Sequence, residues 1–156
     1  MKTASHILAF CLALFLGSVA LAGEAKVTLH LLDHTEKKET KERFWIDWCD
    51  RWQGVVETKT VTGEVADKII AQLGKSLLKE ESDNLCGHHP IYGIVATQED
   101  GTVFKTSLCF SCGTWVKPKK RLSIAGKHGV NNELCKTLRA IIELPQDVLE
   151  GKSTQP

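Results

Sequence analysis

The sequence carries no excess of charge of either sign. Its 156 residues include 20 Lys and Arg against 19 Asp and Glu. One of those lysines, Lys2, lies in the first 22 residues, and without them 19 basic residues face 19 acidic ones. A chain without net charge lacks a long-range attraction to nucleic acid or to an anionic membrane surface. We therefore expect neither of these as a partner.

Recognisable catalytic motifs are absent as well. The chain contains no Gly-x-Ser-x-Gly elbow, no glycine-rich phosphate loop and no His-Glu-x-x-His pair. It also has no internal repeat. These absences favour a non-enzymatic protein with an unidentified binding partner, for which another protein is one candidate.

The one long apolar run lies at the N-terminus. Lys2 is the only charge before Glu24, and Ile7–Ala22 is an unbroken stretch of apolar and small residues that ends in Ala-Leu-Ala. This stretch is shorter than the roughly 20 residues that span a bilayer. The pattern predicts a signal peptide over residues 1–22 and an exported protein, secreted or periplasmic, with no stable membrane anchor after cleavage.

Hydrophobic periodicity predicts the remaining elements. Alternation indicates a strand at 26–34, and Val and Thr content indicates one at 54–63. The turn Glu99-Asp100-Gly101 between 91–98 and 102–110 indicates a strand–turn–strand unit, with short strands expected at 114–116 and 121–125. A helix is expected in the region Glu64–Glu81, with its apolar stripe starting at Val65 and Thr62 as its cap. A second helix is expected at 131–144, capped by Asn131 or Asn132 and stopped by Pro145.

These elements together predict the fold class. Sequential strands joined by tight turns form an antiparallel sheet, and two amphipathic helices must bury one face each. We expect an α+β fold with an antiparallel sheet and two helices packed on one face. A single domain is expected over residues 23–150, followed by a disordered tail at 151–156.

The segment Phe44–Trp52 fits two secondary structures. Trp45, Trp48 and Trp52 share one face of a helix, whereas Phe44, Ile46 and Trp48 alternate as in a strand. Tryptophan side chains bury large areas, so we expect all three in the core. An aromatic patch that binds a ligand is the alternative.

The segment CFSCGTW (Cys109–Trp115) raises the question of a metal site. Cys109 and Cys112 would point to opposite faces of a regular strand, so they converge only if the chain turns between them. Gly113 permits such a turn because it tolerates positive φ. A Cys-x-x-Cys-Gly turn after a strand resembles the knuckle of zinc ribbons.

A second half-site precedes it. Cys86 and His89 have the same spacing, and the composite Cys-x₂-His-x₁₉-Cys-x₂-Cys matches four-ligand zinc sites. We therefore predict a structural zinc site formed by Cys86, His89, Cys109 and Cys112, with His88 as the alternative to His89. Cys49 and Cys135 then remain as one possible disulfide pair.

Export leaves two alternatives open. Disulfides form readily outside the cytosol, so Cys86 can pair with Cys109 or Cys112 in a disulfide-stabilised binding or inhibitor module. Cys109 and Cys112 can also act as a thiol–disulfide redox pair, although the residues after Cys112 do not continue as the helix that lowers the thiol pKa in such proteins.

The other histidines suggest less. His30 and His34 form His-x₃-His on one side of a predicted strand and are expected to be solvated. His128 lies in a glycine-rich loop and is expected to be a turn residue. The basic run KPKKR (Lys117–Arg121) surrounds a proline and predicts a solvated turn.

Part of the chain resembles small exported bacterial proteins of uncharacterised function. The resemblance rests on WQGVVETKTV before a helix, on CGHHPIYGIVATQEDG as a Cys-x-x-His-Pro entry to a hairpin, and on SLCFSC as a Cys-Phe-x-Cys exit. It covers Trp52–Leu144 and implies no activity. The segment 44–52, with Cys49, lies outside it.

Overall fold

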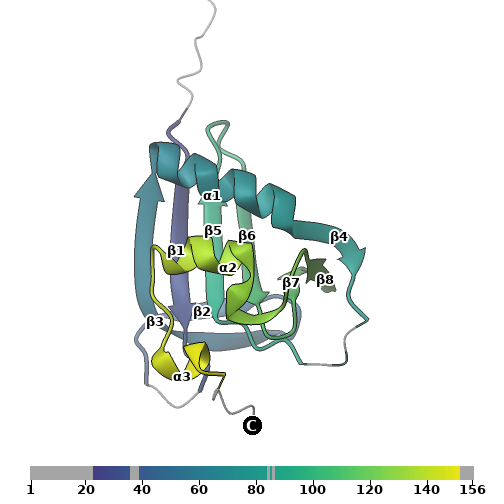
Figure 1. The fold of residues 1–156 in the computed structure, drawn as a ribbon. Coiled ribbons are helices and arrows are strands. Elements are labelled where there is room, and N and C mark those ends of the chain that lie inside the picture. Colours follow the sequence, from purple (N-terminus) through teal and green to yellow (C-terminus); the bar gives the residue numbers. More distant parts are fainter. Residues whose placement is uncertain (1–22, 36–38, 84, 86, 152–156) are drawn as a thin grey trace, which may run out of the picture.

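The fold is an antiparallel sheet with helices on one face, as predicted (Figure 1). The computed structural model describes residues 23–35, 39–83, 85 and 87–151. The predicted signal peptide, Cys86 and residues 152–156 of the predicted tail lie outside these ranges. The sheet has eight strands in the order β2-β3-β1-β5-β6-β7-β8-β4.

The elements follow the chain in a simple order. The strands are β1 (Lys26–Leu32), β2 (Arg43–Ile46), β3 (Arg51–Thr62), β4 (Leu77–Glu81), β5 (Tyr92–Thr97), β6 (Val103–Cys109), β7 (Thr114–Lys117) and β8 (Lys120–Ile124). The helices are α1 (Gly63–Ser76), α2 (Glu133–Arg139) and α3 (Gln146–Leu149), with a 3₁₀ turn η1 (Gly129–Asn131). No helix among the described residues is long and apolar enough to cross a membrane.

One face of the sheet, which we call the helix face, packs against α1 and α2 (Figure 1). Val27, Leu29 and Leu31 alternate along β1 and are buried there, as a strand with one covered face requires. Ile69 and Leu73 of α1 are buried against the same cluster. Burial of this apolar area supplies the main stabilisation of the fold.

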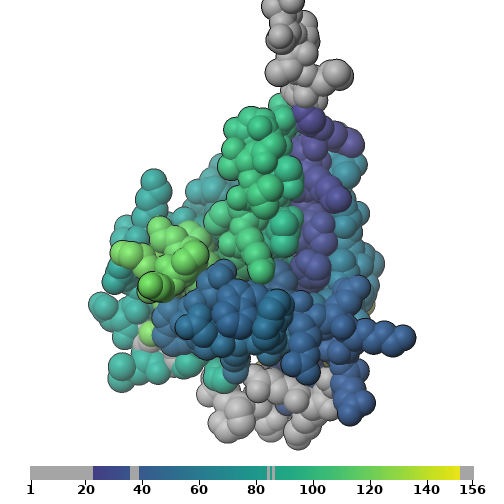
Figure 2. Space-filling view, turned by 180° about the vertical axis from the view of Figure 1, so that it is seen from behind, coloured from purple at the N-terminus to yellow at the C-terminus, as the bar shows by residue number. Residues whose placement is uncertain are grey.

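The opposite face is covered by a two-stranded ribbon. Arg51–Gly54, at the start of β3, pairs with β2, and β3 then pairs with β1 from Val55 onward. Phe44 and Ile46 of β2 pack on this ribbon face of the sheet against Leu32 and Val116. Figure 2 shows the ribbon in dark blue across the back of the sheet.

A close approach between Phe44 and Gly93 of β5 joins the ribbon to the sheet. A Cβ atom on Gly93 would lie 2.7 Å from the Cδ2 and Cε2 atoms of the Phe44 ring. Two other side chains also contact the Phe44 ring. The ring centroids of His30 and Phe44 are 5.4 Å apart, and Lys105 Nζ lies over the ring at 4.7 Å from its centroid. The ring therefore lies directly on the backbone of a central strand.

The expectation that all three tryptophans lie in the core was wrong for Trp52, which is 58% exposed, and for Trp45, which is only half-buried and belongs to neither core cluster. Trp45 and Trp52 are cross-strand partners in the ribbon and meet edge to face at 5.2 Å between centroids. Trp45 alternates with Phe44 and Ile46 along β2, and Trp52 lies directly opposite Trp45, so both occupy the outer side of the ribbon. Only the inner side contacts the sheet.

Both helices are shorter than predicted. The region Glu64–Glu81 splits into α1 and β4 because Leu77 and Glu81 pair with Ile124 and Leu122 of β8. Val65, the predicted start of the stripe, is 49% exposed. Strand pairing here overrides a helical pattern, since tertiary hydrogen bonds outweigh helix propensity.

The C-terminal helix ends at Arg139 instead of Leu144. Asn132 caps its start as predicted, because Asn132 Oδ1 accepts a hydrogen bond from Leu134 N at 3.0 Å. Pro145 then occupies the N-cap position of α3. Proline suits the start of a helix because it has no N–H to leave unpaired.

Candidate functional site

The Cys-x-x-Cys segment forms the predicted turn. Cys109 ends β6, Thr114 begins β7, and the two residues pair across the hairpin. Between them, Gly113 N donates a hydrogen bond to Phe110 O at 3.2 Å. Gly113 has φ of +63°, a conformation that favours glycine. The turn thus has the geometry that the sequence implied.

The two cysteines of the turn contact different groups. Both are buried, with Cys109 0% and Cys112 2% exposed. Cys109 Sγ lies 3.3 Å from Ser111 Oγ, whereas Cys112 Sγ lies 3.1 Å from the carbonyl oxygen of Gly87. Cys109 is a free thiol, and Cys112 is not among the free cysteines of the described chain.

The structure does not gather the described members of the predicted zinc set. His89, Cys109 and Cys112 are described, and no three His, Cys, Asp or Glu residues within 23–35, 39–83, 85 and 87–151 form a group that could hold a metal ion. Cys86, the fourth predicted ligand, lies outside these residues. The zinc site therefore stays a prediction.

The second predicted cysteine pair is not brought together either. Cys49 packs against the cluster on the ribbon face, and Cys135 is buried in the cluster on the helix face. Both are free thiols. Burial raises the pKa of both, and that of Cys135 rises to about 11. At neutral pH Cys135 is therefore a protonated thiol and a poor nucleophile.

His88 is a structural residue of the ribbon face rather than an available metal ligand. Its side chain is 2% exposed, and both ring nitrogens are used: Nδ1 bonds Thr114 Oγ1 at 3.0 Å and Nε2 bonds Ser107 Oγ at 2.9 Å. The ring thereby joins β6 to β7. Because both ring nitrogens are hydrogen-bonded, a metal could bind His88 only by breaking one of these bonds.

Aromatic and basic groups surround His88. The Trp48 ring meets it edge to face at 6.4 Å, and Arg121 lies 4.8 Å above the Trp48 ring. Arg51 Nη2 donates to the carbonyl oxygen of His88 at 3.4 Å. Burial, then the charges of Arg121 and Arg51, lower the pKa of His88 to about 3. The imidazole is therefore neutral at physiological pH.

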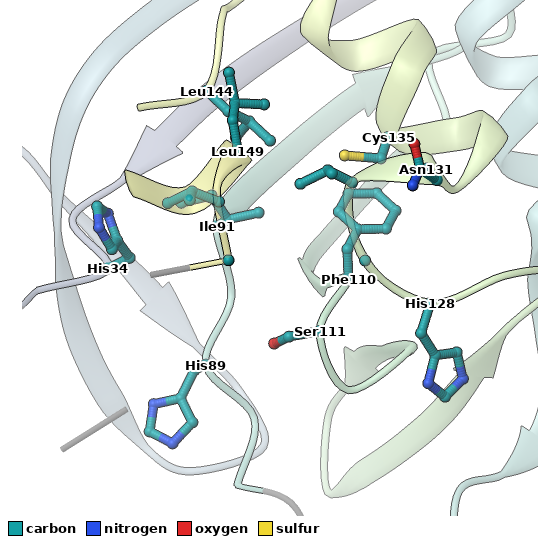
Figure 3. A pocket seen from close by; sticks show the side chains of 14 residues that line it. His34, His89, Ile91, Phe110, Ser111, His128, Asn131, Cys135, Leu144 and Leu149 are labelled. Atoms are coloured by element: carbon teal, nitrogen blue, oxygen red, sulfur yellow. The ribbon is translucent and has the colours of Figure 1, made fainter. Parts of the chain in front are cut away.

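A cavity of about 600 Å³ opens on the helix-face side of the Cys-x-x-Cys turn (Figure 3). It lies between the ends of β5 and β6, η1, α2 and α3. Its apolar lining comes from Ile91, Phe110, Val130, Leu144, Val148 and Leu149. Its polar side chains are those of His34, His89, Ser111, His128, Asn131 and Cys135.

One of these histidines ties the C-terminal helix to the sheet. His34 Nε2 and Asp147 Oδ2 of α3 are 2.8 Å apart. This hydrogen bond lowers the pKa of Asp147. The wall formed by α3 is fixed by this contact, so the expectation that His34 is merely solvated was wrong.

His89 and His128 lie at the cavity edge but not together as a pair. Figure 3 places Ser111 between them. Sequence reasoning took His89 as a zinc ligand and His128 as a turn residue. The only sequence feature that pointed to this cavity was the Cys-x-x-Cys turn, because Phe110 and Ser111 of that turn form part of the cavity wall.

Comparison with known proteins adds no relative. No family model, curated protein or solved structure matches the chain.

Proposed function

We propose that the protein is an exported, non-enzymatic domain that binds a small molecule in the cavity beside the Cys-x-x-Cys turn. The observation that carries this proposal is the cavity itself, with a volume of about 600 Å³, an apolar lining and a few polar side chains. Binding sites for small molecules typically combine these properties.

The reactive groups of the cavity favour binding over catalysis. The Cys135 thiol is buried and protonated, because burial raises its pKa to about 11. His34 is held by Asp147, and the Ser111 hydroxyl is 3.3 Å from Cys109 Sγ. A nucleophile needs a base within hydrogen-bond reach. Among the described residues, no hydrogen bond joins Ser111 or Cys135 to a histidine, and the hydrogen bond of His34 goes to Asp147.

The proposal also replaces the predicted zinc site with a disulfide. In this arrangement Cys112 is bridged to Cys86, while Cys49, Cys109 and Cys135 remain thiols. The support is that Cys112 is not one of the free cysteines and that its Sγ lies 3.1 Å from the carbonyl oxygen of Gly87, the residue after Cys86. The bridge would tie the segment before β5 to the turn that walls the cavity.

Filling the cavity should abolish binding. The Val148→Trp variant places an indole where the apolar lining now leaves space, so the fluorescent apolar probe anilinonaphthalene sulfonate should lose its saturable, one-to-one binding. Titration of the probe against the folded variant, with circular dichroism to verify the fold, measures this.

Val103→Trp is the matched control, because Val103 is 63% exposed on β6 and does not line the cavity. This variant should bind the probe as the wild type does. Equal binding by both variants, or no binding by the wild type, would refute the cavity as the binding site.

Peptide mapping without reductant tests the cysteine arrangement. Protein from an exporting host should yield one disulfide, Cys86–Cys112, and a native mass without zinc. Cys112→Ser should cost about 3 kcal/mol of unfolding free energy, the typical effect of losing a bridge of this loop length. Cys49→Ser, which removes a free thiol, should cost much less. One bound zinc, released on denaturation together with three free thiols, would contradict this arrangement and establish the metal clamp.

A further inference from the structure

The C-terminal helix α3 forms one wall of the cavity. Val148 and Leu149 of α3 line it, together with Leu144 before the helix and Gly151 after it. In Figure 3, Leu144 and Leu149 lie on the side of the cavity where the yellow turn of α3 passes, with His34 beside that turn. Val148 and Leu149 are each half-buried, so α3 has the cavity on one side and solvent on the other.

The chain is held firmly up to Leu144. Lys59 Nζ donates a hydrogen bond to the carbonyl oxygen of Ile141 at 2.9 Å, and the Tyr92 hydroxyl donates one to the carbonyl oxygen of Ile142 at 2.6 Å. Leu144 is 4% exposed and belongs to the cluster on the helix face. The two donors come from β3 and β5, so residues 141–144 are anchored to the sheet itself.

The helix α3 is held by much less. None of its four residues is buried, whereas α2 buries Leu134, Cys135 and Leu138. Val148 and Leu149 pack against the cluster on the helix face only as partly buried residues. A helix this short is not stable through its own hydrogen bonds. The position of α3 therefore depends on its contacts with the rest of the fold.

The hydrogen bond between His34 and Asp147 ties α3 to the end of β1. His34 Nε2 and Asp147 Oδ2 are 2.8 Å apart, and the imidazole N–H is the donor because a carboxylate only accepts. The His34 side chain is 13% exposed, whereas that of Asp147 is 46% exposed. Water can therefore replace the imidazole at the carboxylate, and a hydrogen bond that competes with water has a small net effect. This bond can break and re-form while the rest of the fold stays intact.

Pro145 separates the anchored segment from α3. It is the N-cap residue of α3, with φ of −55° and ψ of 146°. Its carbonyl oxygen accepts hydrogen bonds from the backbone N–H groups of Val148 and Leu149, so this oxygen moves with α3. Rotation about the Cα–C bond of Pro145 therefore swings α3 as a unit and leaves residues 141–144 in place.

We propose that α3 is a lid over the cavity, latched by the hydrogen bond between His34 and Asp147, and that the ligand enters and leaves when α3 swings away at Pro145. This inference rests on the proposed function and adds the control of ligand exchange at the same site. The closed lid places Val148 and Leu149 against the ligand. The latch sets how often the lid opens, so it governs association and dissociation together and leaves their ratio nearly unchanged.

Stopped-flow mixing of anilinonaphthalene sulfonate with protein from an exporting host measures both rates. The test variant is Asp147→Ser, at a residue that does not line the cavity. Serine can still bond Val148 N, as Asp147 Oδ1 does at 3.0 Å, but it is too short to reach His34. Association and dissociation should both become about three- to tenfold faster, the change in the opening equilibrium that corresponds to one hydrogen bond. The dissociation constant should stay nearly the same.

Two further variants separate the latch from other effects, with circular dichroism to verify each fold. Asp147→Asn keeps an acceptor for the imidazole N–H and should exchange the probe more slowly than Asp147→Ser. Glu143→Ala is the matched control, because it removes the same charge from an exposed residue on the anchored side of Pro145 that does not line the cavity. This control should exchange the probe at the wild-type rates.

The outcomes separate the lid from the cavity. Unchanged rates in Asp147→Ser, equal rates in Asp147→Ser and Asp147→Asn, or faster rates in Glu143→Ala overturn the latch and leave the cavity as a binding site. Faster dissociation alone, with affinity weakened in proportion, overturns the lid and makes α3 a static wall that contacts the ligand. Absence of saturable binding by the wild type overturns both the lid and the proposed function.

Discussion

Acidification from about pH 7.5 to pH 5 should cost the protein about 2 kcal/mol of unfolding free energy through His88 alone. The folded-state pKa of His88 is about 3, whereas a histidine in an unfolded chain has a pKa of 6.5. At pH 5 the unfolded state therefore binds a proton that the folded state excludes. The stabilisation is complete above pH 6.5 and falls steadily as the pH drops toward 3.

Urea unfolding at the two pH values measures this loss in the wild type and in His88→Gln. Glutamine does not titrate, and its amide can still bond the hydroxyls of Ser107 and Thr114, so the variant should lose about 2 kcal/mol less on acidification. His128→Gln removes an exposed histidine and should lose the same unfolding free energy on acidification as the wild type. The same loss in His88→Gln as in wild type would show that the buried imidazole is not its source.

Gly93→Ala should destabilise the fold by about 2–3 kcal/mol, in the range observed for overpacked cores. The added Cβ would lie 2.7 Å from two carbons of the Phe44 ring. That ring cannot slide aside freely, because His30 and Lys105 contact it. The ribbon of β2 and β3 must then lift from the sheet.

Thermal and urea unfolding, followed by tryptophan fluorescence, test this effect. Gly74→Ala is the matched control: Gly74 lies on the exposed side of α1, and apart from its chain neighbours and the backbone of its own helix no heavy atom lies within 4 Å of the added Cβ. Alanine there should raise stability by up to about 1 kcal/mol, as helix propensity predicts. Adding Phe44→Leu to Gly93→Ala should recover part of the loss, and an unchanged stability of Gly93→Ala would disprove the steric argument.

Local patterns predicted the fold well where neighbouring residues decide the structure. The hairpin of β5 and β6, the turn at Gly101 and the Asn132 cap all follow from residues close in sequence. The strand β4 was missed, because Leu77–Glu81 continues a helical pattern and becomes a strand only by pairing with β8. Nothing in residues 77–81 themselves identifies β8 as their pairing partner.

The candidate site was predicted only in part, for a similar reason. The spacing of the two Cys-containing segments implied that they meet, and Cys112 Sγ does lie 3.1 Å from Gly87 O. The two adjacent histidines, however, take opposite roles: His88 is buried on the ribbon face, while His89 lines the cavity. Which of two neighbours turns inward depends on the hydroxyls of Ser107 and Thr114, which are distant in sequence.

The connection through α1 also constrains the curvature of the whole sheet. α1 leaves β3 near one edge and delivers the chain directly to β4 at the other, with five strands between them. Six interstrand steps of a flat sheet would span about 29 Å. A helix of 14 residues reaches only about 21 Å. The sheet must therefore curve toward α1, so that the helix spans the shorter straight distance between β3 and β4. The cavity lies on the concave side of this curved sheet.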